Sequence, residues 1–155
     1  MTQVYVSQHP LIAHKLGKLR SVHTDSRKFR ELVKEIAGLL AYEATADLAV
    51  CPVDVETPMG IARGQELEET VGLIPILRAG LGMVEGIWEF LPSAEVWHIG
   101  IYRDEKTLKP VQYYNKLPTM PRVSVCLVLD PMLATGGSAI ATIDILKKWG
   151  AKRIK

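Results

Sequence analysis

The residues best suited to chemistry follow an apolar run late in the chain. Residues 123–129 read VSVCLVL, which is typical of a buried β-strand, and Asp130 comes directly after them. The loop that follows closes in TGGS at 135–138 and leads into a helical pattern over 138–149. Glycines allow tight turns and close ligand approach, and the free amides that begin a helix attract phosphate. The pattern predicts a monophosphate site in this loop, with Asp130 as an acid for hydroxyls or a hydrated metal.

Two arginines also follow predicted strands. Arg78 ends the apolar run 71–77 and is followed by a Gly-containing helix start, and Arg103 ends the next apolar strand. A guanidinium is always charged and binds phosphate oxygens through charge-assisted hydrogen bonds. Because parallel strands end at the same edge of a sheet, we expect both arginines to lie beside Asp130. Arg103 also opens the polar segment 103–117, which we predict to be a hairpin-like, mobile flap whose arginine reaches a diphosphate when the ligand binds.

Three stretches resemble the type I phosphoribosyltransferases. Four apolar residues, an acid and TGGS resemble the phosphoribosyl-diphosphate loop of that family. The form DPMLATGGS at 130–138 is similar to the uracil phosphoribosyltransferase branch in particular, because Pro131 stands where most of the family has a second acid. PILRAG at 75–80 resembles the family's pyrophosphate loop, which implies a non-proline cis peptide at Leu77–Arg78 or Arg78–Ala79.

This resemblance implies a reaction and the residues that perform it. The implied activity is pentosyl transfer in pyrimidine salvage, from 5-phospho-α-D-ribose 1-diphosphate to uracil, giving UMP and diphosphate. Catalysis is assigned to Asp130, Arg78 and Arg103, with Asp104 and Glu105 as weaker candidates. The expected contacts with phosphoribosyl diphosphate are Arg78, Ala79, Gly80, Arg103, Asp130, Pro131, Met132, Leu133, Ala134, Thr135, Gly136, Gly137 and Ser138.

The resemblance also implies a cofactor, an effector and self-association. Since Pro131 removes one carboxylate, we expect Mg²⁺ to arrive with the diphosphate and its waters, with no direct protein ligand. Family members form dimers or larger homo-oligomers, and some are activated by GTP. An arm at 50–69 and an apolar helix at 26–48 offer surfaces for such an assembly.

The C-terminal end of the sequence bears on what this chain can do. Gly150 suits a helix stop, and residues 151–155 look like the start of another strand. Family members continue further, so we expect a single phosphoribosyltransferase domain over 1–155, incomplete at its C-terminal end, with the uracil-binding residues beyond Lys155. Three alternatives stay open: a transferase for another base, a nucleotide-responsive RNA-binding regulator, and a chain that binds phosphoribosyl diphosphate without transferring it.

Composition narrows the class of protein. A chain of 155 residues with 48% apolar and 23% charged residues suits one globular domain, and a net charge of +2 gives no support for nucleic-acid or membrane binding. We see no targeting segment and no apolar run of the roughly 18 residues needed to cross a bilayer, so we expect a cytoplasmic protein. Cys51 and Cys126 form no metal motif and are expected to be free thiols.

Strands alternate with helices after residue 70, which predicts an α/β fold with a mostly parallel sheet flanked by helices. Pro75 predicts an irregular end to its strand. The helix after Thr24 or Asp25 carries an apolar stripe at Phe29, Leu32, Val33, Ile36, Leu39 and Leu40. The expected elements are strands at 4–7, 71–77, 96–102 and 123–129, helices at 9–19, 26–48, 80–91 and 138–149, and, within 50–69, a hairpin or two edge strands on either side of Met59 and Gly60.

Overall fold

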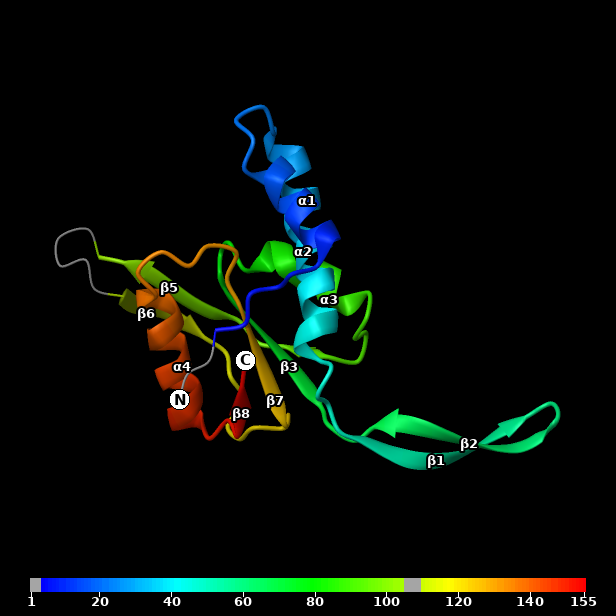
Figure 1. The fold of residues 1–155 in the computed structure, drawn as a ribbon. Helices are drawn as coiled ribbons and strands as arrows, with labels where there is room; N and C mark the ends of the chain where they lie inside the picture. The colour runs from blue at the N-terminus through cyan, green and yellow to red at the C-terminus, as the bar shows by residue number, and fades with distance from the viewer. Residues whose placement is uncertain (1–3, 105–109) are drawn as a thin grey trace.

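The computed structural model describes residues 4–104 and 110–155, and its elements follow the predicted alternation (Figure 1). In chain order they are α1 (Pro10–Leu19), α2 (Ser26–Ala44), β1 (Val50–Thr57), β2 (Gly60–Leu67), β3 (Val71–Leu77), α3 (Leu81–Trp88), β4 (Glu95–Val96), β5 (Ile99–Arg103), β6 (Pro110–Asn115), β7 (Val125–Leu129), α4 (Gly137–Trp149) and β8 (Arg153–Ile154).

The main sheet has the strand order β6-β5-β3-β7-β8, and β4 also pairs with β3. Strands β3, β4, β5, β7 and β8 run parallel, whereas β6 returns antiparallel to β5. This arrangement confirms the α/β fold with a mostly parallel sheet. Because β3 lies between β5 and β7, the carboxyl ends of these three strands meet at one edge.

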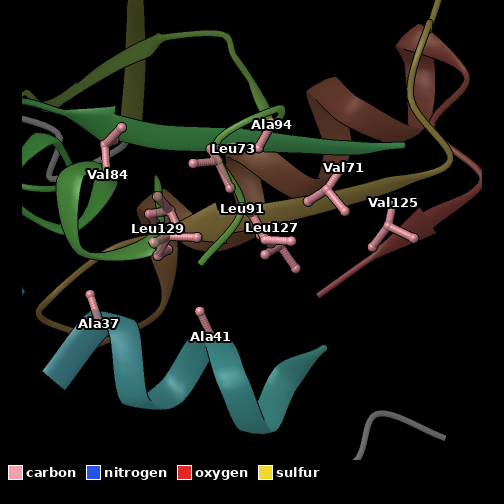
Figure 2. Close-up of a cluster of buried hydrophobic side chains, with 11 residues drawn as sticks. Ala37, Ala41, Val71, Leu73, Val84, Leu91, Ala94, Val125, Leu127 and Leu129 are labelled. Atoms are coloured by element: carbon pink, nitrogen blue, oxygen red, sulfur yellow. The ribbon is translucent and has the colours of Figure 1, made fainter. Parts of the chain in front are cut away.

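Alternate residues of the central strand build two cores. Val71 and Leu73 belong to a cluster that includes Ala37 of α2 and Val84 of α3, which Figure 2 shows beneath the sheet. Residues of the opposite parity, including Ile74, pack with α4 on the other face. Burying a large aliphatic side chain contributes about 1.5–3 kcal/mol relative to leaving it exposed, so burial on both faces holds the strand ends in place.

Pro75 is fully buried in the central strand. Its backbone nitrogen, which carries no hydrogen, faces the side of the strand on which β4 and β5 pair. Leu73 accepts a hydrogen bond from the amide of Trp97, so Pro75, two residues later, turns its nitrogen to the same side of the strand. Pairing with β5 begins only at Ile76. A proline cannot donate to the sheet, which accounts for the break of the predicted strand 96–102 into β4 and β5.

The apolar stripe predicted on α2 is partly wrong. Phe29 and Leu40 are exposed, and Ala37, Gly38 and Ala41 are buried instead. The reason is a close crossing with α3: a Cβ on Gly38 would lie 2.9 Å from the Gly86 carbonyl oxygen, and one on Gly86 only 2.0 Å from that of Lys34. Small residues therefore mark the contact. Helix α2 also ends at Ala44 rather than at residue 48.

Other boundaries differ from the prediction at the ends of elements. Residues 4–9 form no strand, and Val4 and Val6 are exposed, because an alternating pattern makes a strand only beside a partner edge. Helix α3 is shorter than predicted and ends at Trp88. The arm is confirmed: β1 and β2 pair antiparallel from Val50↔Leu67 to Thr57↔Gly60, and the hairpin extends away from the sheet (Figure 1).

Charged side chains join the root of the arm to β8. Arg153 donates from Nη1 to both carboxylate oxygens of Glu69, at 2.8 and 2.9 Å, and from Nη2 to Asp47 at 2.6 Å. Lys155 also pairs with Asp47. The amide of Ala49, followed by Arg153, lowers the pKa of Glu69, and Lys155, followed by Arg153, lowers the pKa of Asp47. These pairs stabilise the ionised forms of both acids.

Two further observations concern the cysteines and the length of the apolar helices. Both cysteines are free, as predicted, and burial raises the pKa of the Cys126 thiol to about 11. Helices long and apolar enough to cross a membrane do not occur in the part of the chain that the structure describes.

Candidate active site

Three loops meet at the carboxyl edge of the sheet. Arg103 is the last residue of β5, Arg78 follows β3, and Asp130 follows β7. Since β3 lies between β5 and β7, the turn that carries Arg78 stands between the other two loops. The structure thus brings the three sequence-predicted residues to one edge of the sheet.

The loop after β7 has the geometry of an anion site. The amide of Met132 donates to Oδ1 of Asp130 at 3.1 Å, which fixes the carboxylate at the start of the loop. Gly136 has φ 76°, a left-handed conformation that favours glycine, and it begins α4 without a side-chain capping hydrogen bond. The first amides of α4 are therefore available to a ligand at the positive end of the helix dipole.

Arg103 reaches into this loop. Its Nη2 donates to Oγ1 of Thr135 at 2.6 Å, and a Cβ added to Gly137 would lie 3.9 Å from the same nitrogen. The pocket here is lined by Arg103, Asp130, Met132, Leu133, Ala134, Thr135, Gly136, Gly137, Ser138 and Ala139. The guanidinium, the carboxylate and the loop amides therefore share one cavity.

The turn after β3 folds back against β7. The Leu77–Arg78 peptide is cis, at one of the two bonds named from the sequence. Gly80 donates its amide to the Ile76 carbonyl at 2.9 Å, and a Cβ on Gly80 would lie 2.3 Å from the carbonyl oxygen of Leu129. Leu129 precedes Asp130, so this contact sets the distance between the Arg78 turn and the acid.

Some predicted residues lie beside the pocket rather than in its wall. Arg78 and Ala79 are exposed at the turn, and neither they, Gly80 nor Pro131 lines the cavity around the phosphate loop. Ala139 does line it and was missed by the sequence analysis. The signal was present, because a site built from helix-start amides extends into the first turn. Glu105 lies outside the described residues.

The residues at this site limit how a metal ion can be held. Groups of three or more His, Cys, Asp or Glu side chains suited to a metal do not occur within 4–104 and 110–155. Asp130 is the carboxylate that lines the pocket. This donor set fits Mg²⁺ that keeps water and phosphate oxygens as most of its ligands.

Known proteins are similar to this chain in sequence. The family model described as uracil phosphoribosyltransferase matches residues 6–155. Two curated proteins of that name are similar over the whole chain: the one from Roseiflexus sp. is 59% identical and the one from Bacillus pumilus 54%, and the chain covers 74% and 75% of their lengths.

Solved structures share the fold of this chain. A protein from Aquifex aeolicus has a TM-score of 0.89 at 38% identity, over 97% of this chain and 72% of that one. A hypoxanthine phosphoribosyltransferase from Staphylococcus aureus has a TM-score of 0.58 at 11% identity, over 90% of this chain and 66% of its own, which shows the fold alone. The chain has a phosphoribosyltransferase fold and belongs to the uracil phosphoribosyltransferase family.

Proposed function

We propose that this chain transfers the phosphoribosyl group of 5-phospho-α-D-ribose 1-diphosphate to uracil, releasing diphosphate and UMP in pyrimidine salvage. Family membership supports this pentosyltransferase activity. The observation that carries the proposal is the meeting of Arg103, Asp130 and the TGGS loop in one pocket, with the Arg78 turn beside it. A sugar with a monophosphate at one end and a diphosphate at the other needs two anion sites flanking an acid.

The loop at 134–138 is proposed to hold the 5-phosphate. Its amides begin α4, and the hydroxyls of Thr135 and Ser138 add donors to the same wall of the pocket. Backbone amides fixed by a helix keep their geometry when the ligand binds. The sugar is thereby held with its reactive carbon in a constant position.

Asp130 is proposed to bind the ribose hydroxyls. The hydrogen bond from Met132 orients its carboxylate through Oδ1, and Oδ2 can accept from the 2- and 3-hydroxyls. Departure of diphosphate leaves positive character on the ribose ring, and a nearby carboxylate stabilises that charge more than it stabilises the neutral sugar. Asp130 therefore acts mainly in the transition state.

Arg78 and Arg103 are proposed to bind and stabilise the leaving diphosphate, together with Mg²⁺. Arg78 follows β3 beside Asp130, where it can neutralise charge that develops on the leaving diphosphate. Mg²⁺, when bound, would supply further neutralisation of the same group, and it would arrive with the diphosphate and its waters. The N1 nitrogen of uracil then bonds to the carbon from which diphosphate departs, and the N1 proton passes to water or to the departing diphosphate.

Two measurements test this function together. Isothermal titration with phosphoribosyl diphosphate and then with uracil measures binding, and release of UMP and diphosphate measures transfer. We expect both. Binding of the sugar diphosphate without UMP formation would favour the alternative, a phosphoribosyl-diphosphate-binding protein or nucleotide-responsive regulator of the same fold. Absence of both would reject the proposal.

The proposal also includes the formation of a homo-oligomer and activation by GTP. Met59 and Ile61 at the arm are 97% and 78% exposed, and exposed apolar side chains on a projecting hairpin support a dimer or larger homo-oligomer. Light scattering at several protein concentrations checks the mass in solution. Activation by GTP stays a prediction, checked by the rate of UMP formation with and without GTP.

A further inference from the structure

One arginine contacts both ends of the arm. The chain enters the arm through residues 45–49 and leaves it through residues 68–70. Arg153 of β8 donates from Nη1 to both carboxylate oxygens of Glu69 on the exit side, at 2.8 and 2.9 Å. Its Nη2 lies 2.6 Å from Oδ2 of Asp47 on the entry side. The Glu69 side chain is only 17% exposed, so salt screens this pair less than an open surface pair.

Further hydrogen bonds complete the same cluster. The amide of Ala49 donates to Oε2 of Glu69 at 2.9 Å, which joins the entry of the arm to its exit directly. Nζ of Lys155 donates to the carbonyl of Ala44 at 2.6 Å and also pairs with Asp47. We call the four charged residues of this cluster the root clamp: Asp47, Glu69, Arg153 and Lys155.

The root is where the direction of the arm is set. Strands β1 and β2 pair with each other in a two-stranded sheet of their own, separate from the main sheet. The hairpin extends away from the body of the molecule (Figure 1). Strand β8, by contrast, belongs to the main sheet, where Arg153 is in register with Val125 of β7. The root clamp therefore connects a projecting hairpin to the packed core.

We propose that the root clamp is a conformational lock: when closed it fixes the direction of the arm relative to the main sheet, and when open it lets the arm pivot about residues 45–49 and 68–70. Ion pairs suit a lock because their charged groups are well solvated once they separate. The consequence for assembly rests on the proposed function. The arm can offer Met59 and Ile61 to a second copy only in the direction that its root gives it.

Distances between two spin labels test the lock directly. Met59→Cys at the exposed end of the arm and Lys148→Cys on exposed α4 each take a label, and Cys51→Ser removes a partly exposed thiol. Cys126 stays unlabelled, because it is buried and burial raises the pKa of its thiol to about 11. Dilution with unlabelled chain restricts the measurement to pairs within one copy. With the clamp closed, we expect one narrow distance distribution.

Variants of the clamp should widen this distribution. Arg153→Met removes the bridging cation, and Glu69→Gln removes the charge of its partner while keeping an oxygen for the Ala49 amide. If the two residues act as a pair, the double variant should be no wider than Arg153→Met alone. Arg63→Met is the charge-matched control. Its pair with Asp54 lies within the arm, at 3.9 Å and exposed, so the distribution should stay narrow.

Hydrogen exchange distinguishes an arm that pivots from an arm that unfolds. The Glu68 amide donates to the Ala49 carbonyl at the root. In Arg153→Met it should exchange about 10- to 100-fold faster, the effect expected from losing hydrogen bonds to a charged group, whereas amides near the end of the hairpin should keep their wild-type rates. If Arg153→Met fails to fold by circular dichroism, Glu69→Gln decides. Unchanged distances in the folded variants, or fast exchange along the whole arm, would overturn the lock.

Light scattering separates the lock from the proposed homo-oligomer. A wild-type chain that stays monomeric at all concentrations would reject the oligomer, while the distance measurement still decides on the lock. If the wild type assembles, Arg153→Met should need a higher protein concentration to reach the same mass, and Arg63→Met should not. Equal concentrations for Arg153→Met and the wild type would contradict the link between arm direction and assembly.

Discussion

Gly80→Ala isolates the placement of the Arg78 turn. Gly80 has φ −61°, a conformation that alanine adopts freely, so backbone strain is not the issue. The added Cβ would instead lie 2.3 Å from the carbonyl oxygen of Leu129 and 2.7 Å from the amide nitrogen of Ile76. Both are backbone atoms of central strands. The first distance is about 1 Å shorter than the 3.4 Å at which ordinary contact begins, so the turn must move away from β7.

This shift predicts a loss of rate larger than the loss of stability. A displacement of about 1 Å at a positioning group can cost roughly 100-fold in rate, whereas overpacking of this kind costs about 1–3 kcal/mol of folding free energy. We expect kcat/KM for phosphoribosyl diphosphate to fall by about that factor. Pyrophosphate binding should weaken, and ribose 5-phosphate binding should persist because the loop at 135–138 is untouched.

Gly82→Ala is the matched control. It lies two residues later in α3, and its Cβ would meet Cγ1 of Val33 at 3.6 Å, an ordinary contact. Replacing glycine by alanine inside a helix is otherwise favourable by up to about 1 kcal/mol, so this variant should be at least as stable and as active as the wild type. The assay is steady-state UMP formation with thermal melting of each variant. A Gly80→Ala variant with normal kcat and KM would refute the reasoning.

Three further predictions concern the loop, the acid and the charged pairs at the arm. Gly136→Ala places alanine at φ 76°, which costs about 1–2 kcal/mol, so ribose 5-phosphate should bind about 5- to 30-fold more weakly in titration calorimetry. Asp130→Asn should lower kcat about 100-fold with little change in KM in steady-state kinetics. If kcat and KM fell by the same factor, kcat/KM would be unchanged, and this would contradict a role in the transition state. The amide of Ala49 and then Arg153 hold the folded-state pKa of Glu69 below its ordinary 4.5. The ionised carboxylate therefore stabilises the fold above pH 4.5, and this stabilisation is lost as the pH falls through the folded-state pKa. Melting temperature should drop on acidification below about pH 5, and Arg153→Met should flatten that drop; identical pH profiles would dismiss the pairing.

Secondary structure was predicted correctly from the sequence where the local pattern and the long-range packing favour the same element. The apolar runs at 71–77 and 123–129 both contain strands, because each is buried on two faces of a parallel sheet. Gly150, with φ 99°, ends α4 as predicted, and the chain then pairs with β7 as β8. In these places the local signal and the tertiary environment favour the same structure.

The sequence was a poorer guide where a distant partner decides. Val4 and Val6 alternate like a strand, yet no edge receives them. The buried face of α2 runs through Gly38 because of Gly86, which lies far along the chain and cannot be seen in a helical periodicity. Packing between elements, rather than propensity, set both outcomes.

At the candidate site, the sequence predicted the residues better than their partners. The strand ends placed Arg78, Arg103 and Asp130 on one edge, as topology requires. The contact of Arg103 with Thr135 could not be foreseen, since it depends on how far a long side chain reaches across from β5 to the loop after β7. The role of each residue stays a prediction.

A crystal structure of the chain with bound phosphoribosyl diphosphate and Mg²⁺ tests the central claim most directly. The account predicts one sugar that spans the edge, with its 5-phosphate on the amides of 135–138, its hydroxyls on Asp130, and its diphosphate beside Arg78 and Arg103. Density for the diphosphate in the TGGS loop, or a ligand that leaves that loop empty, would contradict it.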